Sequence, residues 1–324
     1  MSVLCLVEHD GDGVGEASLR ALSFARRLAA TSGEGLAALC VGEPGDQTVQ
    51  ILADYGVDEL HPVAGSAFES FAPVAWARAV LELAAALPAT AVVAAGTDRG
   101  NEVMAHAGAL SGLTMVANCF EATRVDEGCV HLTRQRWAGS LIEEARLEST
   151  TALLTVAFDG VAAEPAFQPS DVRVHGFTPT LNEQDLRVQV AEFRARDAGV
   201  SLADARVVVG GGRGVGSAEG FTIIEELAGL LGGAVGVSRA VTSLGWRSHS
   251  QQVGQTGTRI APDLYLVCGI SGATQHLAGC QSAKHVVAIN TDPDAPIIMR
   301  ADYAVIGDLN EIIPALVNAI RARA

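Results

Sequence analysis

The stretch RVVVGGGRGVGS at residues 206–217 decides the fold of the second half of the chain. A short β-branched run leads directly into a glycine-rich loop, and a helical pattern over residues 217–231 follows. A loop of this kind between a strand and a helix lets backbone N–H groups approach a phosphate at the positive end of the helix dipole. Glycine loops also serve plain chain reversals, so this loop alone does not identify a ligand.

The glycine loop departs from the two common nucleotide-binding fingerprints. It has no GxxxxGK[ST] run of a P-loop, and GRGVGS at residues 212–217 ends in serine where a strict G-x-G-x-x-G has glycine. The next predicted strand ends in Ser238-Arg239 rather than in the acidic residue that holds an NAD ribose. These departures argue against an NAD-type dehydrogenase.

Strand and helix patterns alternate from this loop to the end of the chain. The alternation predicts a doubly wound parallel sheet of Rossmann-like topology, whose strand ends should line a crevice. We expect strands at residues 206–209, 234–237, 264–268 and 285–289, and helices at residues 217–231, 273–278 and 309–323.

The first half of the chain shows the same alternation before it changes to shorter segments. We expect strands at residues 3–8, 36–41 and 91–95, and helices at residues 18–30, 73–87 and 102–110. The later segments, at residues 115–125, 129–135, 147–157 and 172–175, suggest antiparallel additions to the same sheet. A charged helical pattern at residues 181–199 contains the expected domain boundary. The sequence thus predicts an α/β protein of two domains, residues 1–190 and 191–324, each a doubly wound, mostly parallel sheet.

Composition excludes several classes of function. The 324 residues carry 22 Lys+Arg against 37 Asp+Glu, a formal net charge of −15, which argues against nucleic acid and anionic membranes as partners. Six scattered cysteines without a CxxC pair indicate reduced core thiols rather than a zinc or iron–sulfur site. No signal peptide and no apolar stretch near 18 residues stand out, so we expect a cytoplasmic protein without membrane insertion.

Polar and glycine residues gather at three further predicted strand ends. They are VSR at residues 237–239, QVGQTG at residues 252–257 and GISGATQH at residues 269–276. Together with Arg213 they supply hydroxyls, amides, one imidazole and two guanidiniums, but no pair of carboxylates and no nucleophile beside a base. This set favours a cofactor cradle over a hydrolase.

These segments carry a resemblance to a known family. In order, the chain reads GVSR at residues 236–239, QVGQTG at 252–257, GISGATQH at 269–276 and AINTD at 288–292. The set closely resembles the FAD-binding segment of the alpha subunit of electron-transfer flavoprotein, with its run G-x-S-R, Q-V-G-Q-T-G, G-I-S-G-A-x-Q-H and A-I-N-x-D. It spans residues 206–310, and residues 1–190 resemble the family's first domain more weakly, in length, in strand order and in the opening LVEH.

The resemblance implies roles for residues around a flavin ring. Arg239 would lie over the ring, where its charge favours the negatively charged reduced flavin; the alternative is a surface salt bridge. Thr256 would offer its hydroxyl to the ring nitrogen N5, although residues 252–257 alone would pass for an ordinary turn. His276 would donate toward the flavin C2 carbonyl oxygen, although a lone histidine is usually structural. Gln255 would contact the same edge.

The resemblance also implies residues for the rest of FAD. Ser238, Ser271 and Gly272 would hold the pyrophosphate or the ribityl chain. Asn290 and Asp308 would hold the adenosine end, with a helix N-cap as the alternative for Asp308. The same segments add Gln252, Val253, Gly254, Gly257, Ala273, Thr274, Gln275 and Leu309 to the expected cofactor contacts.

Two features of the second domain leave questions open. Arg213 would lie near the open side of the flavin or contact a partner subunit. At residues 242–246 the chain reads TSLGW, where the family commonly has an acidic residue two places before the glycine. That departure concerns the local tuning of the flavin rather than the fold.

The function that the resemblance implies is electron transfer. The chain would be the alpha subunit of a heterodimer with one FAD, carrying electrons from dehydrogenases, such as the acyl-CoA dehydrogenases of fatty acid beta-oxidation, to a quinone-linked oxidoreductase or another acceptor. It would turn over no substrate of its own, and a beta subunit would complete the flavin site and hold AMP.

Two alternatives remain. In an electron-bifurcating complex the beta subunit would hold a second FAD in place of AMP. In a nucleotide-binding scaffold the redox function would be lost, against which the intact Arg239, Thr256 and His276 speak. The first domain offers no expected site, and its Asp98, Arg99 and Asn101 are expected to serve capping and subunit contacts.

Overall fold

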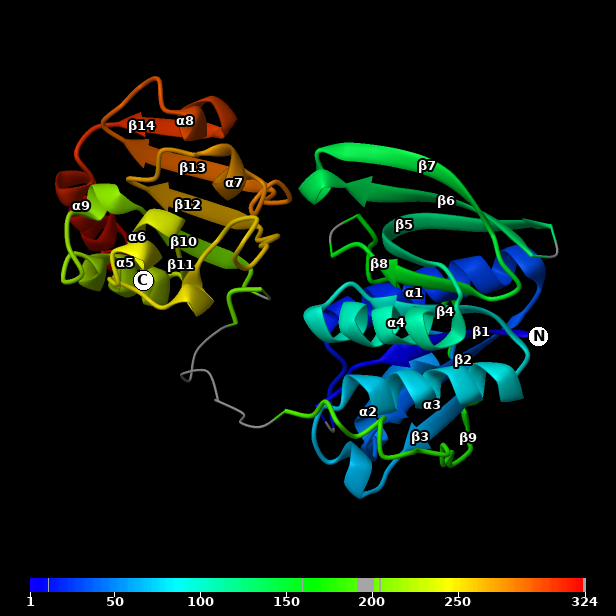
Figure 1. The fold of residues 1–324 in the computed structure, drawn as a ribbon. Helices are drawn as coiled ribbons and strands as arrows, with labels where there is room; N and C mark the ends of the chain where they lie inside the picture. The colour runs from blue at the N-terminus through cyan, green and yellow to red at the C-terminus, as the bar shows by residue number, and fades with distance from the viewer. Residues whose placement is uncertain (11, 127, 159, 191–200, 204, 323–324) are drawn as a thin grey trace. The chain divides into compact units, whose positions relative to one another are not determined.

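The computed structural model describes residues 1–324 except 11, 127, 159, 191–200, 204 and 323–324. The described residues form two compact units, each with its own sheet (Figure 1). The expected boundary between residues 190 and 191 borders residues that lie outside this description, so it stays a prediction. We call the unit before it unit 1 and the unit after it unit 2.

Unit 1 is built on one sheet. Within its described residues the strand order is β7-β6-β5-β8-β4-β1-β2-β3-β9. The strands are β1 Ser2–Val7, β2 Gly35–Val41, β3 Glu59–Val63, β4 Ala89–Ala95, β5 Met115–Asp126, β6 Cys129–Arg136, β7 Leu141–Glu148, β8 Ala152–Val156 and β9 Arg173–Val174. The helices are α1 Glu16–Ser32, α2 Asp46–Asp54, α3 Pro73–Ala86 and α4 Asp98–Ser111, with short 3-10 turns η1 Ser66–Phe68 and η2 Trp137–Gly139.

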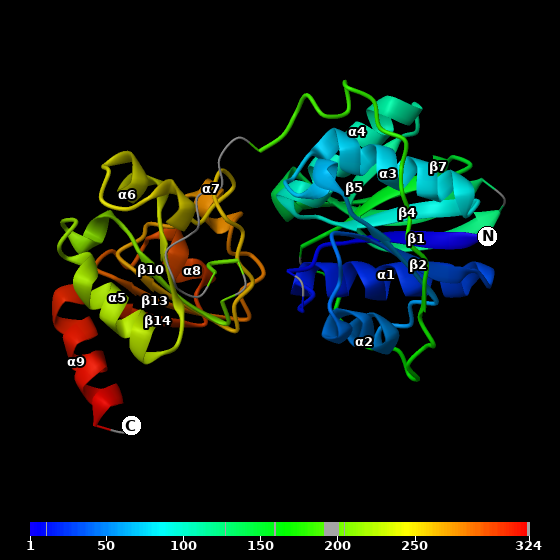
Figure 2. The ribbon, with the colours of Figure 1, turned by 90° about the horizontal axis from the view of Figure 1, so that it is seen from below.

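The apolar run in β1 explains why helices cover both faces of this sheet. β1 pairs in parallel with β2 and β4, and its side chains alternate between two cores. Val3 and Cys5 pack with α1 and α2, whereas Leu4 and Leu6 pack with α3 and α4. Figure 2 shows the two pairs of helices on opposite faces. Such a strand is buried on both sides, which is why it reads as a continuous apolar run.

The expected antiparallel additions are present only in part. β5 and β6 pair antiparallel, as do β6 and β7, but β8 lies parallel between β4 and β5. The segment expected at residues 147–157 divides into the end of β7 and all of β8. A turn separates the two strands, and in it the Ser149 hydroxyl donates to the Thr151 carbonyl at 2.6 Å. β9 is likewise parallel to its neighbour β3.

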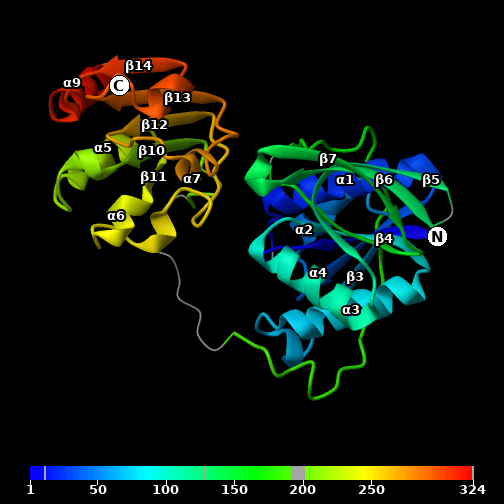
Figure 3. The same cartoon turned by 45° about the horizontal axis from the view of Figure 1, so that its top comes forward.

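Unit 2 is a parallel sheet with the order β11-β10-β12-β13-β14 among its described strands, which Figure 3 shows side by side. The strands are β10 Val207–Gly211, β11 Ala234–Val237, β12 Leu264–Cys268, β13 His285–Asn290 and β14 Tyr303–Ile306. The helices are α5 Phe221–Leu230, α6 Arg239–Ser243, α7 Thr274–Leu277, α8 Pro296–Arg300 and α9 Leu309–Arg321, with 3-10 turns η3 Arg213–Val215 and η4 His249–Gln251. α5 and α9 pack on one face, and α8 packs on the other. The expected fold class, two doubly wound α/β domains, is therefore confirmed.

Two expected helices differ from the structure. The helix expected at residues 217–231 begins at Phe221, because Gly216 has a φ of 92° and the Ser217 hydroxyl accepts from the Gly220 N–H at 3.2 Å in a local turn. The charged pattern at residues 181–190 forms turns rather than a helix. Asn182 and Asp185 accept hydrogen bonds from nearby backbone N–H groups, which compete with helix formation. The rest of that expected helix lies outside the described residues.

The cysteines behave as the sequence predicts. All six are free and buried. Burial raises the pKa of Cys40, Cys119 and Cys268 to about 12, so their thiols stay protonated and unreactive at neutral pH. In the described part of the chain, no helix combines the length and the apolar character that a membrane span needs.

Candidate functional site

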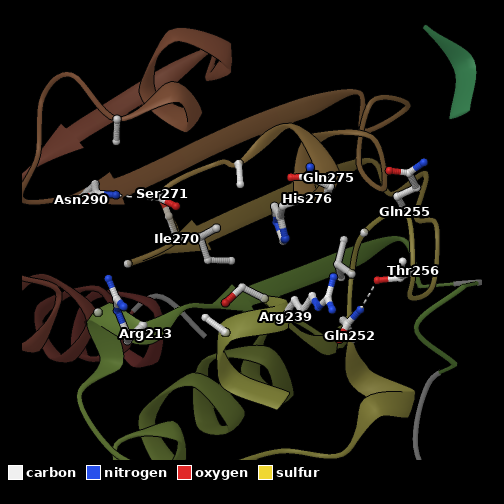
Figure 4. A pocket seen from close by; sticks show the side chains of 18 of the residues that line it. Arg213, Arg239, Gln252, Gln255, Thr256, Ile270, Ser271, Gln275, His276 and Asn290 are labelled. Atoms are coloured by element: carbon white, nitrogen blue, oxygen red, sulfur yellow. Dashed lines mark hydrogen bonds between the residues drawn. The ribbon is translucent and has the colours of Figure 1, made fainter. Parts of the chain in front are cut away.

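A cavity of about 590 Å³ opens at the carboxyl ends of the unit 2 strands (Figure 4). β10 pairs with β11 on one side and β12 on the other, so the segments that follow these strands leave in different directions and open a crevice. The cavity is lined by Arg213, Gly214, Ser238, Arg239, Ala240, Gln252, Val253, Gly254, Gln255, Thr256, Gly269, Ile270, Ser271, Ala273, Gln275, His276, Asn290, Asp292 and Ala295.

The glycine loop after β10 lies against the loop after β12, backbone to backbone. The Gly214 N–H donates to the Gly269 carbonyl at 3.1 Å, and the Gly212 N–H donates to the Cys268 carbonyl at 2.9 Å. A Cβ atom on Gly212 would lie 2.1 Å from the Gly269 carbonyl oxygen. The glycines are therefore required for the approach of the two loops, whether or not they also bind a phosphate.

The segment at residues 252–257 is tied to the sheet rather than being a free turn. The Val253 N–H donates to the Val237 carbonyl at 2.9 Å, and the Gln255 N–H donates to the Gln275 carbonyl at 2.8 Å. Gly254 has a φ of 149°, which side-chain-bearing residues rarely adopt. These bonds hold the segment across the cavity wall, between β11 and α7.

A hydrogen-bonded chain of side chains supports Thr256. Gln252 is 2 % exposed, and its Nε2 donates to Thr256 Oγ1 at 3.0 Å (dashed in Figure 4). The Thr242 hydroxyl donates to Gln252 Oε1 at 2.7 Å. No acceptor among the described residues takes the Thr256 hydroxyl proton, so that proton is available to a ligand.

His276 presents a buried N–H to the cavity wall. The residue is 6 % exposed, and burial lowers the pKa of its imidazole to about 4, although the Val253 main chain partly opposes this shift. The hydroxyl of the fully buried Tyr265 lies 2.9 Å from His276 Nε2. This hydroxyl has no other partner in the described structure, so we assign it as the donor to Nε2, which places the ring proton on Nδ1. Nδ1 itself is buried; it has no well-formed hydrogen bond among the described residues, and only a weaker one to the Val253 main chain opposes the shift.

The charged side chains at the cavity are mostly positive. Arg239 begins α6 and Arg213 begins η3, and neither forms an ion pair within the described residues. Figure 4 shows Arg213 toward the end where Ser271 and Asn290 lie, and Gln255 and Thr256 toward the other end. An elongated anionic ligand suits this distribution, because each end meets donors.

Asn290 joins two of the segments at the end of the cavity near Arg213. Its Nδ2 donates to the Ile270 carbonyl at 2.9 Å, and its Oδ1 accepts from the Asp292 N–H at 3.1 Å. Gly272 has a φ of 80°, and a Cβ atom there would lie 2.5 Å from the Ile297 nitrogen. The loop after β12 is thus held against the loop after β13 and the start of α8.

The structure brings most of the predicted residues together. Those that line the cavity are Arg213, Ser238, Arg239, Gln252, Val253, Gly254, Gln255, Thr256, Ser271, Ala273, Gln275, His276 and Asn290. Gly257, Gly272 and Thr274 adjoin the lining in sequence without forming part of it. Asp308 caps α9, where its carboxylate accepts from the Asn310 N–H at 2.8 Å, and Leu309 packs in the core beneath α9. The alternative role expected for Asp308, the helix N-cap, is thus present.

Sequence reasoning did not select six lining residues: Gly214, Ala240, Gly269, Ile270, Asp292 and Ala295. Gly269, Ile270 and Asp292 lie within the quoted family segments, so their position was a usable signal. Ala240 and Ala295 carry no polar group that a sequence pattern could mark. Among the described residues, no group of three or more His, Cys, Asp or Glu side chains could hold a metal ion.

Comparison with known proteins gives matches over both units. The family model described as the electron transfer flavoprotein domain matches residues 3–175, and the one described as the electron transfer flavoprotein FAD-binding domain matches residues 201–281. The chain is 36 % identical to an electron transfer flavoprotein subunit alpha of Mycobacterium tuberculosis, over 99 % of this chain and 98 % of that one. It is 34 % identical to the corresponding subunit of Thermoanaerobacterium thermosaccharolyticum, over 94 % and 93 % of the two chains. It is 32 % identical to a probable mitochondrial subunit alpha of Caenorhabditis elegans, over 98 % and 93 %.

Proposed function

The chain belongs to the electron transfer flavoprotein alpha-subunit family, and from that premise we propose that the unit 2 cavity holds FAD and that the chain is an electron carrier. One observation carries the proposal: the FAD-binding family match at residues 201–281 covers most of the segments that line the cavity. The cavity lies at the carboxyl ends of the strands, where doubly wound sheets bind nucleotides.

The residues of the cavity fit an FAD molecule. His276 Nδ1 is a buried donor without a well-formed hydrogen bond among the described residues, and a ligand carbonyl would satisfy it. Gly214 lines the cavity without a side chain, and Gly212 beside it lets the two loops approach each other. Two arginines suit a pyrophosphate and a flavin that becomes negatively charged on reduction.

The bound flavin supplies the chemistry of accepting and releasing single electrons. Around its ring we assign Arg239 as the charge that favours reduction, Thr256 as the hydroxyl toward N5, and His276 as the neutral donor toward the C2 carbonyl. Gln255 contacts the same edge. Because burial lowers the pKa of His276 to about 4, its ring is neutral near pH 7, and Arg239 carries the positive charge at the flavin ring.

The remaining contacts follow the length of the cavity. Ser238 and Ser271 hold the ribityl chain or the pyrophosphate, and Asn290 lies at the adenosine end with Arg213. The contacts expected from Gly257, Gly272, Thr274, Asp308 and Leu309 stay predictions, because these residues lie outside the lining.

The chain works as one subunit of a heterodimer with an electron transfer flavoprotein beta subunit. We propose that this partner completes the flavin site and holds AMP. Electrons then pass from flavin dehydrogenases, such as those of fatty acid beta-oxidation, to a quinone oxidoreductase or another acceptor. The chain turns over no substrate of its own. The net charge of −15 suits basic docking surfaces on these proteins.

The test is a count of flavin in the heterodimer. The chain is co-purified with its beta partner, FAD is supplied, and the flavin is quantified by absorbance after acid release. One FAD per heterodimer supports the carrier. Two FAD per heterodimer would assign the chain to an electron-bifurcating complex, and no flavin in a folded complex would overturn the proposal.

A further inference from the structure

We propose that Thr242 and Gln252 are positioning residues that let the Thr256 hydroxyl act either as a donor or as an acceptor toward the cavity. The inference deepens the proposed function and rests on it, since it takes the ligand near Thr256 to be the N5 edge of FAD. It concerns the direction of the hydrogen bonds in the chain Thr242–Gln252–Thr256.

In the first direction, Thr256 is a donor toward the cavity. The Thr242 hydroxyl donates to Gln252 Oε1 at 2.7 Å, and Gln252 Nε2 donates to Thr256 Oγ1 at 3.0 Å. Because the Thr256 oxygen already accepts a hydrogen bond from Gln252, its own proton is free to point into the cavity. Gln252, in the middle, is 2 % exposed, whereas Thr242 is half-buried and Thr256 is exposed to the cavity.

In the second direction, Thr256 is an acceptor. The oxygen and nitrogen of a side-chain amide exchange places when the amide rotates by half a turn, with little change in shape. Gln252 Nε2 would then donate to Thr242 Oγ1, and the Thr256 hydroxyl would donate to Gln252 Oε1. The Thr256 oxygen then keeps a lone pair for a donor in the cavity.

The reversal is possible because Thr242 has a second acceptor. Its hydroxyl lies 3.0 Å from the Arg239 carbonyl oxygen, so its proton keeps a partner when Gln252 turns. Both directions therefore leave each end of the Gln252 amide with one partner. If only one orientation of the Gln252 amide gave all these groups a hydrogen-bond partner, Thr256 would be fixed either as a donor or as an acceptor.

The two roles match the two protonation states of the flavin. Toward an oxidised flavin Thr256 would be the donor to N5, and toward a flavin reduced by two electrons and protonated at N5 from solvent it would be the acceptor. Thr256 therefore serves the oxidised ring in the first direction and the protonated ring in the second. The three hydrogen-bonded side chains therefore let N5 become protonated without leaving its N–H opposite the O–H of Thr256.

The test removes the far end of the chain. Thr242→Val leaves Gln252 with an unpaired oxygen in the first direction and an unpaired N–H in the second. Since an unpaired buried N–H is tolerated less often than an unpaired carbonyl oxygen, the variant favours Thr256 as a donor. We expect the equilibrium constant for adding the second electron to the flavin to fall roughly three- to tenfold, the range for the loss of one neutral hydrogen bond. A tenfold fall lowers a one-electron potential by about 59 mV.

Two controls separate this role from general damage. Thr242→Ser restores the hydroxyl and should restore the potential. Thr222→Val removes a threonine whose hydroxyl also donates to a backbone carbonyl three residues earlier, that of Glu219 at 2.8 Å, but which lies outside the cavity. It should leave both potentials unchanged.

The measurement is a stepwise reductive titration of the flavin-loaded heterodimer, followed by absorbance. A fall in the second potential alone in Thr242→Val, with both controls at the wild-type values, supports the inference. Equal shifts of both potentials, no shift, or a Thr242→Ser variant that behaves like Thr242→Val would overturn it while the bound flavin leaves the proposed function standing. A wild-type complex without FAD would overturn both.

Discussion

The two units have similar sheets but differ at the carboxyl ends of their strands. In unit 1 the polar groups there pair with each other: the Thr97 hydroxyl donates to the Glu8 carboxylate, and the Thr155 hydroxyl donates to Asn101 Oδ1 at 2.8 Å. In unit 2, His276 Nδ1 has no well-formed hydrogen bond among the described residues. A parallel sheet thus offers a place for a ligand at the carboxyl ends of its strands, and donors without partners inside the protein make that place a binding site.

The same difference appears in the use of close backbone contacts. In unit 1 a Cβ atom on Gly96 would lie 2.2 Å from the Val156 carbonyl oxygen, so a glycine is needed where the backbone after β4 passes the end of β8. In unit 2 Gly212 allows an equally close approach, but the loops that meet there also form a wall of the cavity. Four substitutions test this contrast, in order of decreasing expected effect.

Gly212→Ala should force apart the loops that follow β10 and β12. Its Cβ atom would lie 2.1 Å from the Gly269 carbonyl oxygen, so the loops must separate, at a cost of about 3 kcal/mol in the free energy of unfolding. Flavin should be lost from the heterodimer as well. Gly229→Ala is the matched control, because a Cβ atom there meets nothing within 4 Å, and it should stabilise the protein by about 0.5 kcal/mol. Urea unfolding and the flavin count decide; equal stability of the two variants would contradict the account.

His276 should make the stability depend on pH. Burial lowers its folded-state pKa to about 4, below the ordinary value of 6.5, so the unfolded chain binds more protons between these values. The contribution of neutral His276 to the free energy of unfolding is therefore present above pH 6.5 and is lost as the pH falls toward 4. Linkage gives a loss of about 2 kcal/mol between pH 7 and pH 5.

The measurement is urea unfolding of the full chain at pH 7, 6 and 5, for wild type and for His276→Gln. The variant should lose less stability over this range than the wild type. His249→Gln, at an exposed histidine, should behave like the wild type. A pH dependence that survives in His276→Gln would show that another group is responsible.

Arg239→Ala should lower the potential of the first electron at the flavin. Removal of a positive charge near a ring that becomes negative should lower the equilibrium constant for adding the first electron at least about tenfold, which lowers its potential by about 59 mV. The flavin count should stay at that of the wild type. Arg206→Ala removes the same charge at a side chain that is 88 % exposed and paired with Asp263, outside the cavity lining, and should leave the potential unchanged. Equal potentials in the two variants would refute the role of Arg239.

Glu8→Gln should have the smallest effect, and it tests whether unit 1 holds any part of the flavin site. Burial raises the pKa of Glu8 above its usual range, so ionisation costs stability as the pH rises through the raised pKa, and this cost is absent at pH 4. The variant should therefore gain a few tenths of a kcal/mol at pH 7 and nothing at pH 4. Glu102→Gln, at an exposed carboxylate, is the control. A loss of flavin in Glu8→Gln would contradict the view that unit 1 holds no part of the site.

The sequence located most of the cavity because three of the four motifs lie at the ends of β11, β12 and β13, and parallel strands end at one edge. The fourth motif, residues 252–257, follows η4 instead and reaches this edge through the hydrogen bond from the Val253 N–H to the Val237 carbonyl. The sequence could not locate the contacts that join the motifs through space. Tyr265 lies inside β12, and its bond to His276 Nε2 depends on the packing of α7. The bond between Thr242 and Gln252 likewise joins two separate segments. Such contacts need the folded arrangement.

The missed strand β3 has a different cause. Pro62 lies within it, and proline in a run argues against a strand. The structure accommodates it because β9 pairs with Glu59 and Leu60, and the segment that follows β9 uses only the carbonyl of Pro62, which accepts from the Phe177 N–H at 3.0 Å. A local pattern cannot show how far the neighbouring strand extends.

The most direct test of the central claim is hydrogen–deuterium exchange on the heterodimer, compared with and without FAD. We expect FAD to slow exchange at residues 252–257 and 269–276 of unit 2 and to leave residues 8–10 and 96–101 of unit 1 unchanged. Protection at the unit 1 strand ends, with none at the unit 2 segments, would contradict that claim.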